Sequence, residues 1–119
     1  MRGNVKKDLI RDYATEAFRT YARMGCPAEA VHSGDTALDA DVAAVQRTLR
    51  YFSAGGREGV VEAVKAVYFV SPGVEIGKGD ISARVERYAA EYYASVRSVY
   101  GWLQKARLRF AKERGLRIK

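Results

Sequence analysis

The sequence predicts an all-α protein of about five helices, folded as one domain over residues 1–119. Apolar residues recur at intervals of three and four in separate stretches, which is the period of an amphipathic helix. No stretch keeps the period-two alternation of a half-buried strand. With 48% hydrophobic and 29% charged residues, the 119-residue chain has enough apolar surface for one core. We expect residues 41–119 to form this core and residues 1–40 to add one helix and a connector.

The first helix is expected between residues 4 and 24. It should end near Gly25, because glycine commonly ends helices and the following Pro27 cannot extend a hydrogen-bonded helix. Residues 26–41 mix Pro, Gly, Ser and Asp with short Ala runs and show no sustained period. We interpret them as a connector, in which acidic side chains cap helices. These side chains are Asp35, Asp39 and Asp41.

Two further helices are expected in the middle of the chain. The second should begin at Asp41 and end at Gly55. Residues 57–70 are rich in Val, which favours strands, but their polar residues are spaced four and three apart. That spacing predicts a third helix. The apolar stripe of the second helix is Val42, Val45, Leu49 and Phe52, and that of the third is Val60, Val61, Val64, Val67 and Tyr68.

A loop and two more helices complete the predicted fold. Residues 71–79 contain three Gly and one Pro, which predicts a loop. A fourth helix should follow, capped by Asp80 or Ser82. The apolar pattern then resets before Ser95, a good N-cap for a fifth and longer helix that ends at Gly115.

Positive charge is concentrated in the last third of the chain. Residues 1–83 contain eleven basic and eleven acidic residues, whereas residues 84–119 contain ten basic and three acidic ones. The whole net charge of +7 therefore lies in the second segment. Such a segment attracts polyanions, of which nucleic acid is the commonest in a cell, although an Arg-rich helix also serves solubility.

The fourth and fifth helices have the spacing of a helix-turn-helix at the C-terminal end of the fold. About three residues separate them, and the capping Ser95 opens the more cationic helix. The first of the pair would pack through Ala89 and Tyr92, and the second through Val99 and Trp102. The N-terminal turn of the second helix would then be free to enter a DNA major groove. An ordinary helical hairpin has the same apolar spacing, but the cap and the charge favour DNA binding.

The first turns of the fifth helix hold the candidate base-reading residues. Arg97 is the strongest, because a guanidinium donates two hydrogen bonds to guanine, and Gln104 suits adenine. Nearby basic residues are candidates for contacts to phosphates. The base-reading candidates are Ser95, Val96, Arg97, Ser98, Tyr100, Gly101 and Gln104, and the phosphate-contacting candidates are Arg84, Arg87, Lys105, Arg107 and Arg109.

The run from Ala94 to Arg107, which includes Val-Tyr-Gly-Trp-Leu-Gln-Lys-Ala-Arg, resembles the recognition helix of sigma-factor region four. Small phage and prophage transcription activators of the RinA and ArpU type are similar there, with the pattern Val-Ser-x-x-Thr-Val-Tyr-x-Trp-Leu-x-x-Ala-Arg. The resemblance covers residues 41–116. It implies a double-stranded DNA-binding regulator of phage or prophage late genes, with RNA polymerase as a partner and a homodimer as one state to test.

Two features depart from that family. Tyr93 stands where a turn glycine is usual, and the loop at residues 71–79 is longer. Two other functions share part of the pattern: a protein-interaction module that docks its basic last helix on an acidic partner, and a small terminase-like subunit that recognises a packaging site as a ring. An enzyme is not expected, because no acid-base or nucleophile constellation is present.

Composition argues against several other classes. Cys26 and His32 supply two of the four ligands of a structural zinc site, so no metal or other cofactor is expected, and His32 should be an exposed loop residue. A single cysteine fits a reducing cytoplasm. No apolar run reaches the roughly 20 residues that span a bilayer, and residues 1–12 lack the apolar block of a signal peptide.

An aromatic cluster surrounds the predicted turn, and two interpretations of it are open. These rings could form a stacking platform for single-stranded nucleic acid. Packing into or against the core is the commoner role of such residues and is favoured here. The cluster consists of Tyr88, Tyr92, Tyr93, Tyr100 and Trp102.

Overall fold

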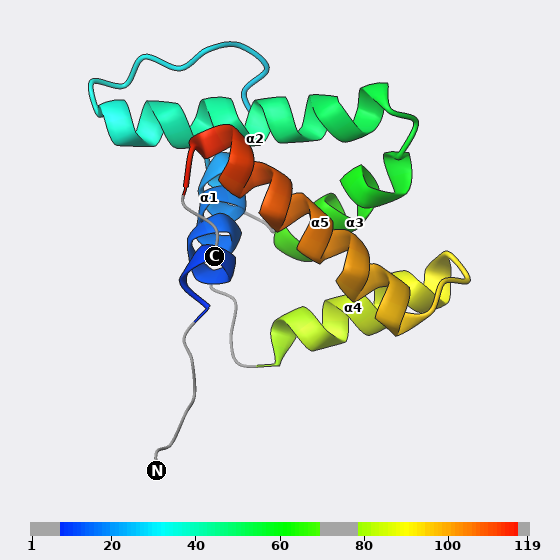
Figure 1. Cartoon of the computed structure of the whole chain (residues 1–119). Helices are drawn as coiled ribbons and strands as arrows, with labels where there is room; N and C mark the ends of the chain where they lie inside the picture. The colour runs from blue at the N-terminus through cyan, green and yellow to red at the C-terminus, as the bar shows by residue number, and fades with distance from the viewer. Residues whose placement is uncertain (1–7, 70–78, 117–119) are drawn as a thin grey trace.

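The computed structural model describes residues 8–69 and 79–116. These residues contain five helices, joined by loops and turns, and no strand (Figure 1). The predicted all-α class is therefore confirmed. The helices are α1 (Leu9–Arg23), α2 (Thr36–Ala54), α3 (Glu58–Tyr68), α4 (Asp80–Glu91) and α5 (Val96–Arg114).

Helix α5 occupies the centre of the arrangement and contacts each of the other four helices. In Figure 1 it runs diagonally, with its N-terminal end beside α4 and its C-terminal end beside α1 and α2. Helices α3, α4 and α5 contact one another pairwise, whereas α4 contacts neither α1 nor α2. Helix α4 therefore lies at one side of the molecule, held to the rest through α3 and α5.

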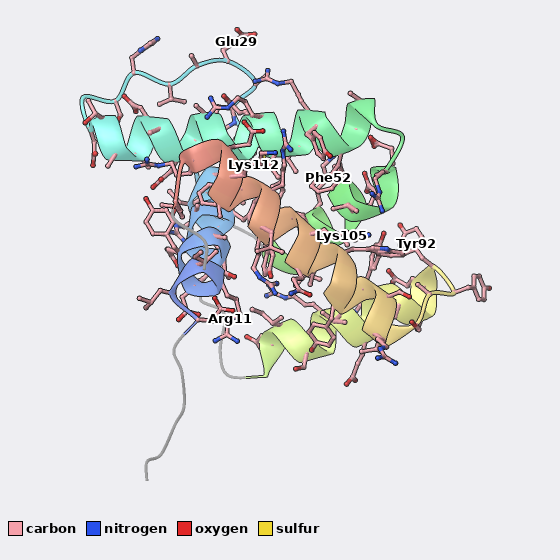
Figure 2. All side chains as sticks on the ribbon, in the orientation of Figure 1. Arg11, Glu29, Phe52, Tyr92, Lys105 and Lys112 are labelled. Atoms are coloured by element: carbon pink, nitrogen blue, oxygen red, sulfur yellow. The ribbon has the colours of Figure 1, made fainter. Side chains whose placement is uncertain are left out.

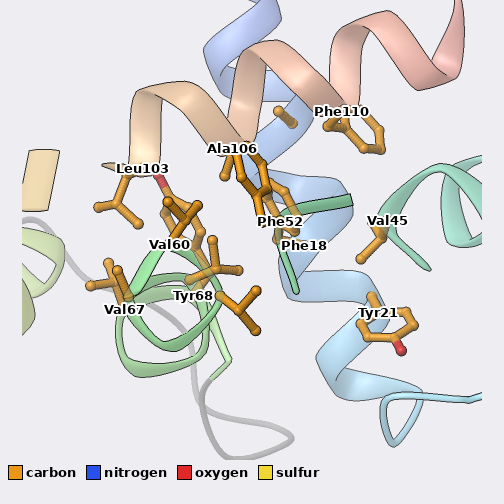
Figure 3. Close-up of a cluster of buried hydrophobic side chains, with 14 of the residues drawn as sticks. Phe18, Tyr21, Val45, Phe52, Val60, Val67, Tyr68, Leu103, Ala106 and Phe110 are labelled. Atoms are coloured by element: carbon orange, nitrogen blue, oxygen red, sulfur yellow. The ribbon is translucent and has the colours of Figure 1, made fainter. Parts of the chain in front are cut away.

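Aromatic rings from three helices meet at the middle of the core (Figure 3). The Phe18 ring stacks on Tyr68 with centroids 5.7 Å apart and lies 5.8 Å from Phe110. Leu103 and Ala106 of α5 are fully buried beside them. Each buried ring of this size contributes about 1.5–3 kcal/mol through removal of apolar surface from water. This burial explains why α3 is helical despite its many Val residues.

The predicted ends of the helices agree with the structure more often than the predicted starts. The Asp8 carboxylate accepts a hydrogen bond from the Arg11 backbone N–H at 2.9 Å, which begins α1. The chain turns after α1 at Gly25, whose φ is +85°. Ser95 caps α5 as expected, and Gly115 ends that helix in the left-handed conformation. The second and fourth helices differ from the prediction at their starts.

Helix α2 begins at Thr36, so the prediction that it begins at Asp41 is wrong. The Asp35 side chain accepts a hydrogen bond from the Leu38 backbone N–H at 3.1 Å, so the capping role predicted for Asp35 is confirmed, whereas Asp41 lies inside the helix and caps nothing. Leu38 packs partly buried against the core, the one large apolar contact of this extra turn. A single such residue is too little to produce a visible period in the sequence. Asp39 lies inside the helix, where its carboxylate accepts hydrogen bonds from Ser33.

The cap predicted for α4 is also wrong. Gly79, with a φ of +89°, is the N-cap residue, and no side chain forms a capping hydrogen bond there. Asp80 is instead the first helical residue. The rest of the predicted loop, residues 71–78, lies outside the described residues.

Candidate nucleic-acid interface

Four residues join α4 to α5 in a tight turn. The backbone N–H of Ala94 donates to the carbonyl of Ala89 at 2.9 Å, which is the six-residue closure that ends many helices. That closure requires a left-handed residue just before Ala94, and Tyr93 fills this position with a φ of +55°. Glycine favours this conformation, and it is the usual residue at this turn position in the sigma-like proteins that the sequence resembles. Tyr93 therefore adopts a conformation that is costly for a bulky side chain.

Helices α4 and α5 contact each other, and small and β-branched side chains are buried on both of them. Ala89 and Val99 are buried at the helix crossing, as the sequence predicts. Tyr100 donates a hydrogen bond from its hydroxyl to the Ser82 Oγ of α4 at 3.2 Å, near the rim of the same interface. Helix α5 therefore leaves the turn with one side held against α4 and with its other side uncovered.

Arg97, Gly101 and Gln104 lie on the uncovered side of α5, whereas Tyr100 lies at the rim of the α4 interface. The Ser95 Oγ accepts a hydrogen bond from the Ser98 backbone N–H at 3.0 Å, which defines the first turn. Val96 is 40% exposed and Arg97 is exposed, and Arg97 forms no ion pair with a described residue. All seven candidates reach the surface, six of them exposed and Gly101 half-buried. The exposed six are Ser95, Val96, Arg97, Ser98, Tyr100 and Gln104.

Gly101 leaves a bare patch of backbone in the middle of this surface. A Cβ atom placed there would find no atom within 4 Å beyond the helix's own backbone. The folded chain therefore does not need a glycine at this position, although glycine in a helix costs about 0.5–1 kcal/mol relative to alanine. Packing within the fold does not explain this glycine. Because it has no side chain, a partner can approach the helix backbone closely at this position.

The candidate phosphate-contacting residues divide into two groups. Arg87 and Lys105 are exposed and form no ion pair with any described residue. The other three hold the fold together. Arg84 donates to the carbonyl of Val67 at 3.1 Å, Arg107 donates to the Tyr68 hydroxyl at 2.8 Å, and Arg109 pairs with Glu113 at 2.6 Å.

A network of ion pairs ties the C-terminal end of α5 to α1 and α2. Asp41 accepts hydrogen bonds from Arg114 Nε and from the Tyr13 hydroxyl, both at 2.7 Å. Arg47 donates to Glu113 Oε1 at 3.0 Å. The sequence does not predict this network, because its partners are far apart in the chain and no local pattern relates them.

The network changes the ionisation of Glu113, one of its two acidic members. Burial of Glu113 by itself would raise its pKa, because the charged form loses water. The hydrogen bonds and positive charges of Arg47 and Arg109 outweigh burial, so the pKa of Glu113 is lowered. Glu113 is therefore ionised at neutral pH and neutralises part of the charge on this end of α5.

The aromatic residues around the turn have different environments. Tyr88 is 5% exposed and Trp102 packs partly buried against the core, as expected. Tyr92 is 60% exposed, yet its ring packs against that of Tyr88 with centroids 4.5 Å apart, whereas the expectation of packing is wrong for Tyr93, which is 98% exposed. Their place in the turn after α4 explains the difference, because a helical stripe no longer applies where the helix has ended. Tyr100 lies between these extremes, 40% exposed.

Comparisons with protein-family models, curated proteins and solved structures find no match to this chain. Within residues 8–69 and 79–116, no helix is both long and apolar enough to cross a lipid bilayer. His32 is exposed, as the sequence predicts, and no group of possible metal ligands occurs in the part of the chain described. The geometry and charge of the α4–α5 region are the remaining guides to function.

Proposed function

We propose that this protein is a sequence-specific regulator of transcription, of the phage or prophage type, that binds double-stranded DNA with the N-terminal half of α5. The observation that carries the proposal is the uncovered face of that half-helix, which presents Arg97, Gly101 and Gln104 together. A recognition helix enters a major groove when one of its faces packs against its own domain and the opposite face is exposed.

Each part of this surface has a distinct task in the proposed complex. Arg97 donates two hydrogen bonds to a guanine edge, and Gln104, seven positions further on, pairs with an adenine. Gly101 lies between them and lets the helix backbone approach the bases. Arg87 on α4 and Lys105 on α5 contact phosphates on either side, which orients the protein without reading sequence.

Selection from a library of random-sequence duplexes tests the proposal. We expect enrichment of a shared motif, and fluorescence anisotropy should show the enriched duplex bound at least about 10³-fold more tightly than a shuffled duplex of the same composition. Affinity should fall with salt, with a log-log slope of about −0.9 for each phosphate contacted. Equal affinity for enriched and shuffled duplexes would contradict sequence-specific binding.

Two single substitutions separate base reading from phosphate contact. Arg97→Ala should remove the difference between enriched and shuffled duplexes, whereas Lys105→Ala should weaken both about equally and reduce the salt slope by about one. Both residues are exposed cations on the same helix, so the pair is matched for charge. Identical effects of the two substitutions would show that Arg97 does not read bases.

The resemblance to sigma-like activators adds two partners to the proposal. RNA polymerase is the first, and a second copy of the chain is the other. A homodimer would protect two half-sites about one DNA turn apart, whereas a monomer would protect one. Light scattering of the free protein also distinguishes both from the ring expected of a terminase-like subunit.

A further inference from the structure

A groove separates the C-terminal halves of α2 and α5, beyond the proposed base-reading residues. Its volume is about 670 Å³, within the range of sites that hold ligands or peptide side chains. Phe52 is buried beneath it, and Tyr51 and Leu108 remain 49% and 43% exposed in its walls. Leu116 closes the end of the groove after α5. The groove therefore has an apolar floor that water covers.

The rim of this groove is cationic. Arg57 lies on the α2–α3 side, and Lys105 and Lys112 lie two turns apart on α5 (Figure 2). Arg109 stands between the two lysines. Among the described residues that line the groove, none is acidic. An apolar floor within a positive rim fits an occupant that combines apolar anchors with negative charge.

Arg109 makes one wall of the groove rigid. Its guanidinium carbon lies 3.7 Å from the centroid of the Tyr51 ring, and its Nη2 pairs with Glu113 at 2.6 Å. The exposed face of Tyr51 is thus already stacked on a cation, which leaves it unsuited to stacking with a base. Lys105, Lys112 and Arg57 form no ion pair with any described residue. Their charges are available to a partner.

We propose that this groove binds an acidic, amphipathic peptide segment of a partner protein. Leucine or aromatic side chains on one face of the segment would contact Leu108 and Phe52, and its carboxylates would pair with Lys105, Lys112 and Arg57. This is the helix-in-groove mode of peptide recognition. A nucleic acid would satisfy the cations, but its phosphate backbone offers no apolar surface for Leu108.

This site shares Lys105 with the proposed DNA-binding face, but none of the base-reading residues lines it, and the proposal does not depend on DNA binding. The candidate base-reading residues end at Gln104, and the groove begins at the next residue, Lys105. A single helix would then hold DNA by its N-terminal half and a protein by its C-terminal half. Such a protein could bring its partner to a chosen DNA site.

Fluorescence anisotropy with a synthetic probe tests the proposal. The probe is a labelled peptide of about fifteen residues, with Leu or Phe at the i, i+3, i+4 and i+7 positions and Glu on the opposite face. The control is a scrambled peptide of the same composition, which keeps the charge and loses the apolar face. We expect the probe to bind at least about tenfold more tightly than the control. Equal binding of the two, or no binding of the probe at about 1 mM, would overturn the proposal.

Two variants on α5 separate this site from the DNA-binding face. Leu108→Gln should weaken the probe at least about fivefold and leave duplex affinity unchanged, whereas Arg97→Ala should leave the probe unchanged. Leu108 is 43% exposed, so the substitution spares the core. In the unaltered protein, amide NMR shifts caused by the probe should concentrate at Tyr51, Leu108 and Lys112. Shifts concentrated at Arg97 and Gln104 instead, or loss of the probe in Arg97→Ala, would overturn the proposal.

Discussion

The two halves of α5 have the same kinds of side chain and different surroundings. In the N-terminal half, Arg97 extends into solvent and forms no ion pair with the described residues. In the C-terminal half, Arg109 and Arg114 are each paired with a carboxylate, at 2.6 and 2.7 Å. One half is held by the fold only along its buried side, and the other is tied to α1 and α2 as well.

This difference shows that cationic charge alone does not identify a binding surface. The last third of the chain holds the whole net charge, yet several of its arginines donate hydrogen bonds to carboxylates, carbonyls and hydroxyls within the protein. The positive charge that is free to meet a partner is smaller than the composition suggests. Among residues 84–116, it is concentrated at Arg87, Arg97, Lys105 and Lys112.

The largest expected effect comes from removing one arginine from each half. Arg114→Ala should lower the free energy of unfolding by about 1–3 kcal/mol, because a charged hydrogen bond to Asp41 is lost in a site where both side chains are mostly covered. Arg97→Ala should change it by less than about 0.5 kcal/mol, since the side chain is exposed. Urea denaturation of both variants measures the difference. Equal effects would contradict the contrast between the two halves.

A substitution at Gly101 should sharpen the contrast by moving stability and binding in opposite directions. Gly101→Ala should raise the free energy of unfolding by about 0.5–1 kcal/mol, because alanine favours the helix and its Cβ meets no neighbour. If the helix backbone approaches DNA here, the same methyl group should weaken duplex binding. Thermal melting and anisotropy on one sample measure both quantities. A variant that is more stable and binds duplex unchanged would remove Gly101 from the interface.

The smallest expected effect is a pH dependence confined to the C-terminal half. The pKa of Glu113 is lowered in the folded protein, so its contribution is complete above the unfolded pKa of about 4.3 and is lost as pH falls through the folded value. Glu113→Gln should therefore lose less stability than the natural chain below about pH 4, by at most about 1 kcal/mol. Urea midpoints measured from pH 7 to pH 3 test this. Parallel curves for the two proteins would show that Glu113 does not contribute.

Local signals account for most of the fold that the sequence predicts. The three-and-four spacing of apolar residues identifies each helix, and the hydroxyl of Ser95 and the freedom of Gly115 mark the ends of α5. The start of α2 was missed because a cap at Asp35 and one apolar contact at Leu38 leave no repeating pattern. Local sequence patterns predict a helix only where several apolar residues face the core on the same side of it.

The candidate site was predictable only in part. The spacing of α5 correctly puts Arg97 and Gln104 on the side opposite Val99 and Leu103. The partners of the other arginines were not predictable, since Arg114 meets Asp41 across 73 positions of sequence. Tyr93 was not assigned to solvent either, because the left-handed turn that exposes it depends on the backbone closure at Ala94.

The central place of α5 also affects how the chain reaches its folded state. Helices α1 to α4 leave the ribosome before α5, the element that contacts all of them. Until α5 emerges, Phe18 lacks Phe110, which lies beside it in the finished core. The nascent chain therefore exposes apolar surface to water during most of its synthesis. Premature termination within α5 would leave an aggregation-prone chain with neither a complete hydrophobic core nor a complete α5.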